Sequence, residues 1–233
     1  MTILCIETST LVCSAAICIG GVPTDERISL NQANHARMLP QFVDELLANL
    51  IRKKLRVEAV AVSAGPGSYT GLRIGTSLAK GLCYGWQIQL LPIDTLQILC
   101  AGAAARMPIN DGLLCPMIDA RRMEVYTNLY DADLQPQGET SAVVVENEDS
   151  LLSASDSQHA AVYYFGDGAE KCQSVLTQPK MHYIAGVIPE AKYMGMLAER
   201  MLANGYQGAD VAYYEPFYLK QFVAAPSHVK GLK

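Results

Sequence analysis

The chain has 233 residues, half of them hydrophobic and 18% charged, so it can build one large or two small domains and is not mainly disordered. Its formal net charge of −5 at pH 7 excludes a basic nucleic-acid-binding surface at the level of the whole chain. If RNA is involved, we expect another subunit to supply the positive charge.

The first residues lack the basic start of a secretion signal, and Glu7 interrupts their apolar run. No apolar stretch reaches the ~18 residues of a membrane span. The seven cysteines include no Cys-x-x-Cys pair, and most lie in apolar runs. We therefore expect a cytoplasmic protein with buried, reduced thiols.

The first half of the chain alternates between apolar runs typical of strands and segments with helical spacing. Gly20-Gly21 predicts a hairpin, and three hairpin-linked strands before any helix are not a Rossmann opening. We expect strands at 2–6, 12–19, 24–30, 57–63 and 88–93, and helices at about 35–51, 70–86 and 95–106.

The pattern restarts after a turn-rich stretch at 107–112. Pro189 suits a first helical position, and Asn204-Gly205 suits a helix end. We expect strands at 113–119, 124–130, 142–145, 161–165 and 181–184, a short helix after Gly166-Asp167-Gly168, and a helix from Pro189 to Asn204. This order predicts an α/β chain of two halves with mixed sheets, at 1–106 and 107–205, and an extended tail at 206–233.

The most distinctive segment is a glycine-rich block at 63–75, which follows an expected strand and opens a helix. Backbone N–H groups at a helix N-terminus suit an anion, but neither a GxGxxG pattern nor a P-loop occurs here. Its helix carries glycines in two pairs, each spaced by four residues: Gly71, Gly75, Gly81 and Gly85. Each costs roughly 1 kcal/mol relative to alanine, so close packing, a subunit interface or a phosphate contact must offset them.

Two polar clusters each have a structural and a functional interpretation. The Glu7–Thr10 turn is either an ordinary hairpin turn or a place to hold a nucleotide-bound metal. The run from Asp119 to Tyr126 contains an Asp, two Arg and a Glu, and is either a surface ion-pair network or a polar contact for a partner or ligand. Asp167 is expected to cap the short helix that follows it.

Metal-dependent and serine-type hydrolysis lack their usual patterns. His35, His159, His182 and His228 are too far apart in sequence for an HxxxH or HExxH pair, and no GxSxG motif occurs. We expect no metal site.

Five segments together resemble the TsaB (YeaZ) family over nearly the whole chain. They are ILCIETST, NHARMLP, SAGPGSYTGLRIGTSLAKGL, IDARRMEVY and FGDGAE. The resemblance implies the actin/Hsp70/sugar-kinase-like (ASKHA) fold. It also implies a non-catalytic relative of TsaD, the glycoprotease-like (Gcp) family enzyme that transfers threonylcarbamoyl from threonylcarbamoyl-AMP to N6 of adenosine 37 of tRNAs reading A-starting codons (t6A37). TsaD has an HxxxH metal motif, which this sequence lacks.

The resemblance further implies that the chain is a scaffold that binds TsaD directly, TsaE within the complex and tRNA indirectly, and that it forms a homodimer when alone. The implied partner contacts lie on two helices: His35, Met38, Leu39, Phe42, Leu46, Leu72, Arg73, Gly75, Thr76, Ala79 and Lys80.

The chain is expected to have no cofactor of its own, although ATP or ADP at the partner interface stays open. Glu7 stands where many nucleotide-binding members of the fold carry aspartate. The candidate nucleotide contacts are Glu7, Thr8, Ser9, Gly65, Gly67 and Ser68. The alternative functions are a free-standing glycoprotease-like peptidase and an ATP-binding or chaperone-like protein.

Overall fold

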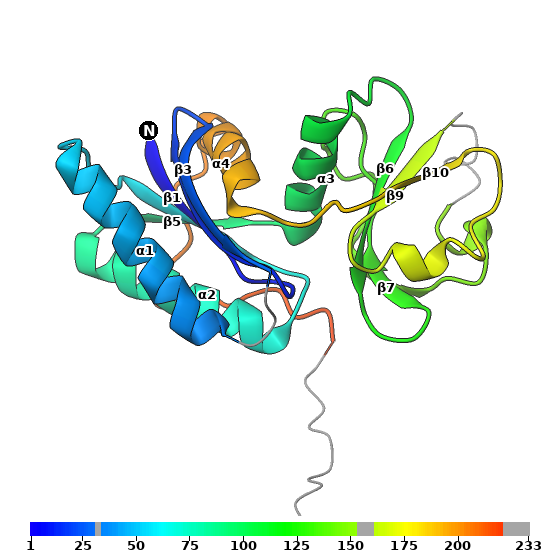
Figure 1. The fold of residues 1–233 in the computed structure, drawn as a ribbon, viewed down its shortest axis with the longest axis horizontal. Helices are drawn as coiled ribbons and strands as arrows, with labels where there is room; N and C mark the ends of the chain where they lie inside the picture. The colour runs from blue at the N-terminus through cyan, green and yellow to red at the C-terminus, as the bar shows by residue number, and fades with distance from the viewer. Residues whose placement is uncertain (31–33, 153–160, 221–233) are drawn as a thin grey trace, which may run out of the picture.

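Two five-stranded mixed sheets organise the chain into two lobes (Figure 1). The computed structural model describes residues 1–30, 34–152 and 161–220. The first sheet has the order β3-β2-β1-β4-β5 and comprises β1 (Thr2–Glu7), β2 (Cys13–Ile19), β3 (Val22–Ser29), β4 (Ala59–Ser63) and β5 (Gln89–Ile93). The second has the order β10-β9-β6-β7-β8 and comprises β6 (Leu113–Asp119), β7 (Glu124–Thr127), β8 (Ser141–Val144), β9 (Val162–Phe165) and β10 (Met181–Ile184).

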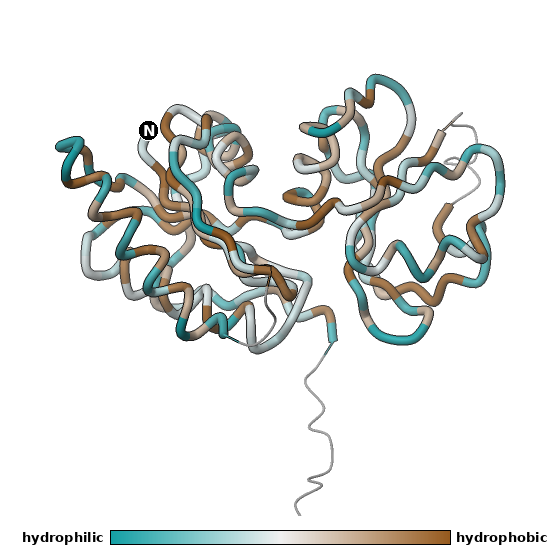
Figure 2. The backbone as a smooth tube through the Cα atoms, viewed as in Figure 1, coloured by the Kyte–Doolittle hydropathy of each residue, from teal (hydrophilic) through white to brown (hydrophobic). Residues whose placement is uncertain are grey.

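Helices cover both faces of the first sheet. They are α1 (His35–Arg52) and α2 (Tyr69–Trp86) on one face, and α3 (Thr95–Arg106) and α4 (Met194–Ala203) on the other. The side chains of β1 alternate between the two faces of the sheet. Leu4 packs with α1 on one face, and Cys5 packs with α3 and α4 on the other. Burial on both faces explains why β1 is a continuous apolar run and not an alternating one. Figure 2 shows hydrophobic residues along these central strands.

Side-chain caps fix the starts of α2 and α3. The Ser68 hydroxyl accepts from the Gly71 N–H, and the Asp94 carboxylate accepts from the N–H groups of Leu96 and Gln97. Such caps satisfy backbone donors that a helix leaves unpaired. The predicted bounds of α3 are confirmed, and those of α1 and α2 are confirmed to within one residue at each end.

The second lobe departs from the prediction at β7, which ends at Thr127 and not at residue 130. The Asn128 amide donates to the Gly138 carbonyl and its oxygen accepts from the Leu129 N–H, and these bonds turn the chain out of the strand. The short helix after Gly168 is a single 3-10 turn at Glu170–Cys172. The predicted bounds of β6 and β10 are confirmed.

The helix expected to begin at Pro189 begins instead at Met194, after a 3-10 turn at Ala191–Tyr193. The preceding residues form the connection back from the second lobe. There the Ala191 N–H donates to the Ser14 hydroxyl of β2 at 2.9 Å, which ties this connection to the first sheet. Helix α4 then packs on that sheet, with Gly195 against Cys18. The proposed domain boundaries at 106 and 205 stay a prediction.

The C-terminal segment, defined here as residues 206–220, returns along the first lobe. Its Ala209 N–H donates to the Leu90 carbonyl at 2.9 Å and its Phe217 N–H to the Ala64 carbonyl at 2.7 Å. At its end Lys220 forms an ion pair with Glu124 of β7. The segment therefore contacts both lobes (Figure 1).

All seven cysteines are buried and unpaired, as the apolar context predicts. No helix within the described ranges is both long enough and apolar enough to span a membrane.

Candidate functional site: the glycine-rich loop and the α1–α2 surface

The glycine-rich block packs tightly against the turn that follows β1. A Cβ atom at Gly67 would overlap the Ser9 carbonyl, and one at Gly71 would overlap the Thr8 carbonyl. At Gly75 it would overlap the Thr8 hydroxyl. Close packing within this chain therefore accounts for the first pair of helical glycines.

Hydrogen bonds hold the two segments together. The Ser68 N–H donates to the Ser9 carbonyl at 2.6 Å, and the Thr8 hydroxyl donates to the Gly71 carbonyl at 2.8 Å. Because Ser68 also caps the Gly71 N–H, part of the anion-binding capacity of this helix N-terminus is used inside the protein.

Glu7 lies at the base of this turn with a fully buried side chain. One carboxylate oxygen accepts from both the N–H and the hydroxyl of Ser9, each at 2.5 Å. The other oxygen has no hydrogen-bond partner among the described residues. Burial raises the pKa of Glu7 to about 7, although the Ser9 hydrogen bonds and the nearby Ser63 hydroxyl lower it in part.

The six candidate nucleotide contacts thus differ in accessibility. Glu7, Thr8 and Ser9 are fully buried, and Gly65 is buried beneath the Phe217 carbonyl. Gly67 is half-buried and Ser68 is exposed. A nucleotide role for these residues stays a prediction, and in this conformation only the last two present surface to a ligand.

Burial also sorts the candidate partner contacts. Seven of the candidate partner contacts are buried within this chain: Leu39, Phe42, Leu46, Leu72, Gly75, Thr76 and Ala79. The regular apolar spacing from which they were predicted therefore marks the core-facing side of each helix. His35 and Met38 are half-buried, and His35 lies 3.1 Å from the Val12 carbonyl. Lys80 is half-buried because it donates to the carbonyls of Ala212 and Tyr214. Only Arg73 is exposed.

The outer surface of the two helices has a different composition, which the spacing argument did not identify. One exposed strip of α2, called here the α2 strip, consists of Thr70, Arg73, Ser77, Gly81 and Tyr84. Gly81 and Gly85 have no atom within 4 Å of a built Cβ position. The signal was present in the sequence, because a glycine at the mid-helix position 81 without an internal contact needs another reason.

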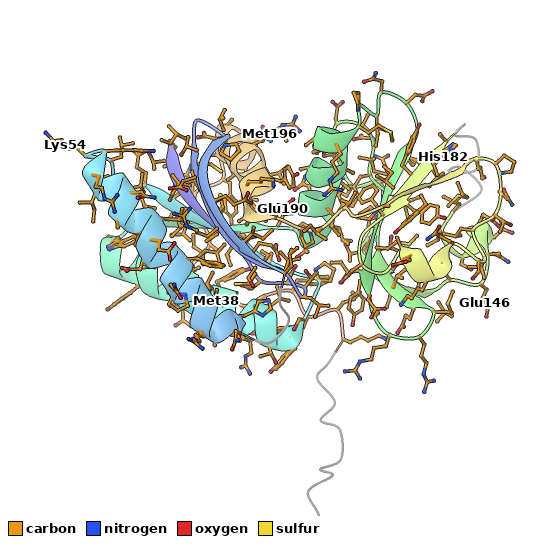
Figure 3. All side chains as sticks on the ribbon, in the orientation of Figure 1. Met38, Lys54, Glu146, His182, Glu190 and Met196 are labelled. Carbon is orange, nitrogen blue, oxygen red and sulfur yellow. The ribbon has the colours of Figure 1, made fainter. Side chains whose placement is uncertain are left out.

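Two open grooves lie between α1 and α2. One, of about 620 Å³, lies at the Met38 end of α1 and is lined by Ala36, Pro40, Tyr69, Ile74 and Leu78 among others. The other, of about 670 Å³, lies at the Lys54 end and is lined by Leu47, Ile51, Leu55, Trp86 and Ile88 among others. Figure 3 labels Met38 and Lys54 at these two ends. The outer face of α1 and α2 thus combines small residues on the α2 strip with two mainly apolar grooves.

The described parts of the chain contain no group of three or more His, Cys, Asp or Glu side chains arranged to hold a metal ion. His35 belongs to α1 and His182 to β10, in different lobes. His159 and His228 lie outside the described residues.

Comparison with known proteins gives one consistent family. A family model described as TsaD, tRNA N6-adenosine threonylcarbamoyltransferase, matches residues 26–226. The chain belongs to the TsaD family, in its TsaB (YeaZ) group. The Escherichia coli protein TsaB, named for tRNA threonylcarbamoyladenosine biosynthesis, is 29% identical over 96% of each chain. TsaB of Haemophilus influenzae is 36% identical over 54% of this chain and 52% of its own length. The chain thus matches about half the length of that relative.

Solved structures agree with this membership. A structure of YeaZ from Pseudomonas aeruginosa has a TM-score of 0.77 and 26% identity, covering 94% of this chain and 99% of that one. A second structure from the same organism, described as similar to peptidase YeaZ, has a TM-score of 0.79 and 27% identity with the same coverage. The predicted α/β fold with two mixed sheets is confirmed, and its membership of the ASKHA class stays a prediction.

Proposed function

We propose that this chain is a non-catalytic scaffold subunit in the synthesis of t6A37, and that it acts by binding a TsaD catalytic subunit through the outer face of α1 and α2. The relatives' names for tRNA threonylcarbamoyladenosine biosynthesis support the pathway. The proposal includes TsaE as a further member of the complex, self-association through the same face when TsaD is absent, and a cytoplasmic location.

The observation that carries the proposal is the α2 strip. Gly81 costs roughly 1 kcal/mol at its mid-helix position, and no atom within the described residues lies close enough to a Cβ there to explain the glycine by packing. Small residues at Thr70, Ser77 and Gly81 allow a partner helix to approach closely. Tyr84, with 75% of its surface exposed, supplies an aromatic anchor beside them.

The buried state of Glu7 and the packing of the glycine-rich block support a structural role for that segment. Its loop is filled by the turn that follows β1, and its first helical turn is capped within the chain. With the missing HxxxH pattern, these features favour a scaffold over the peptidase and the ATP-binding alternatives.

The test is a reconstituted reaction with TsaD, TsaE, tRNA and threonylcarbamoyl-AMP, in which t6A formation and co-elution with TsaD are measured together. The variant Ser77→Arg with Gly81→Arg adds two long charged side chains to the α2 strip without touching the core. We expect it to lose co-elution and t6A formation while keeping its thermal unfolding temperature within a few degrees.

The matched control is Gln173→Arg with Ser174→Arg, two exposed positions on the second lobe. This control adds the same charge, and we expect it to keep both co-elution with TsaD and t6A formation. Normal co-elution of the Ser77/Gly81 variant would contradict the proposed interface. Leu39→Asp is unsuitable for this test because Leu39 is fully buried and a carboxylate there would unfold the chain.

A further inference from the structure

The turn between β6 and β7 holds two consecutive arginines in an unfavourable backbone conformation. Arg121 has φ +74° and Arg122 has φ +48°, both in the left-handed region. Asparagine and glycine are the residues that normally occupy such positions, because side chains with a bulky Cβ substituent are strained there. Such strain persists where the residues serve a purpose beyond folding.

The acidic groups around this turn are already paired with other cations. Asp119 pairs with Lys171, and Glu124 pairs with Lys220. Asp167 does not cap the following 3-10 turn as predicted, because its carboxylate accepts from the Asp119 N–H at 3.0 Å.

The ion pairs at this turn are therefore formed by Lys171 and Lys220, and the two arginines of the turn take no part in them. Arg121 and Arg122 are exposed, and within the described ranges neither guanidinium has a hydrogen bond or an ion pair. Two positive charges remain uncompensated at the tip of the turn.

Aromatic rings continue from this turn to the first lobe. The Lys220 ammonium lies 6.0 Å from the centre of the Tyr126 ring, beside the turn. Two residues earlier, the Tyr218 ring packs against the Tyr69 ring at a tilt of 46°, with ring centres 4.9 Å apart. The Arg73 guanidinium lies 4.9 Å from the centre of the Tyr69 ring.

Two residues of chain span at most ~7 Å, so the backbones of Tyr218 and Lys220 lie close together and the segment carries the two contacts one after the other. Phe217, immediately before Tyr218, is 47% exposed. We call the basic turn and these aromatic groups one strip, because the Lys220–Glu124 ion pair brings the end of the C-terminal segment beside the strand that follows the turn. Figure 1 shows the path of this segment along the first lobe.

We propose that this strip contacts the RNA substrate directly, with Arg121 and Arg122 on backbone phosphates and Phe217 beside an unpaired base. The inference rests on the proposed function, which supplies tRNA as the substrate. Guanidinium groups pair with phosphate oxygens in two-pronged hydrogen bonds, and exposed aromatic rings stack on bases of any sequence. The net charge of −5 makes the contact weak in the isolated chain and strongly dependent on salt.

The test is the variant Arg121→Asn with Arg122→Gly, which removes both charges and places favourable residues on the same backbone. Binding of unmodified tRNA is measured at several salt concentrations, for the full chain alone and for its mixture with TsaD. We expect affinity to fall about tenfold or more at low salt, and the slope of log affinity against log salt to fall by about 1 for each arginine. The unfolding temperature should rise by a few degrees, which a purely structural role for the arginines would not produce.

The matched control is Lys53→Asn with Lys54→Gly at the far end of α1. It removes the same charge, and Lys54 also has a positive φ of 57°. Unchanged tRNA affinity in the Arg121/Arg122 variant overturns the proposal, as does an equal loss in the control. A loss of TsaD co-elution with unchanged tRNA affinity also overturns it and makes the turn a protein contact. Failure of the unaltered chain to co-elute with TsaD contradicts the proposed function, while tRNA binding by the chain alone still decides the RNA contact.

Discussion

The carboxyl group of Glu7 is fully buried inside the first lobe. Its carboxylate has two hydrogen-bond donors on one oxygen and none among the described residues on the other. Removing a carboxylate from water favours its protonated form, and the pKa of about 7 reflects that burial. The folded protein therefore retains a proton on Glu7 at pH values where the unfolded chain has released it.

The stability of the protein should consequently depend on pH through Glu7. The Glu7 contribution is fully present below about pH 4.5 and is lost as the pH rises through about 7. The variant Glu7→Gln keeps an oxygen for the Ser9 donors and cannot ionise. We expect it to be more stable than the unaltered protein at pH 8, by on the order of 3 kcal/mol, and similar at pH 5.

Urea unfolding at pH 5, 6, 7 and 8 measures this difference. The other buried carboxyl groups are common to both proteins, so the comparison isolates residue 7. Parallel pH profiles for the two proteins would show that Glu7 stays ionised in the folded state.

At the scale of a single element, the four glycines of helix α2 lie in two different environments. The N-terminal pair, Gly71 and Gly75, faces the turn after β1, while Gly81 and Gly85 face open space. The same residue type therefore serves internal packing in one half of the helix and leaves an unfilled surface in the other.

Alanine substitutions should separate these two roles. Gly75→Ala places a methyl group against the Thr8 hydroxyl, so we expect a loss of about 1–3 kcal/mol in the free energy of unfolding. Gly81→Ala meets no atom within 4 Å and should stabilise the isolated chain by about 1 kcal/mol. Guanidinium-induced unfolding of both variants decides the matter, and equal effects of the two substitutions would contradict the assignment.

Local sequence signals predicted elements well wherever a cap or a break fixed their ends. Asp94 before α3 is one such signal, and the bounds of that helix are confirmed. Prediction was wrong at Pro189, because a hydrogen bond between Ala191 and Ser14, residues far apart in the chain, ties the connection before α4 to β2. Periodicity likewise located one apolar side of α1 and of α2, but it could not show that Leu39 and Leu72 are buried within this chain and not left for a partner.

At the scale of the whole molecule, the C-terminal segment connects both lobes through few contacts. It contributes Ala209, Val211 and Tyr214 to the apolar cluster beneath α2, and Lys80 donates to two of its carbonyls. The sequence predicted an extended tail, and its aromatic composition gave no indication of this docking site, because the partners lie more than a hundred residues away.

Shortening the chain tests this role. A chain ending at Gly208 loses the hydrogen bonds of Ala209 and Phe217, each worth about 1 kcal/mol, together with the packing of the half-buried Tyr214 ring. We expect its unfolding temperature to fall by at least 5 °C. A chain ending at Lys220 keeps every described contact of the segment and is the matched control. The prediction fails if both shortened chains unfold at the same temperature.

The packing of α4 on the first sheet has a consequence for synthesis on the ribosome. The sheet face that contains Cys5 and Cys18 is formed early in translation, but Gly195 and Leu197, which cover it, are added only after the whole second lobe. At about 5–20 residues per second, that face waits on the order of ten seconds or more for its cover. Helix α3 covers part of this face soon after β5 is made, but the part beneath α4 stays open, and we expect the nascent chain to need a chaperone at the tunnel exit until α4 arrives.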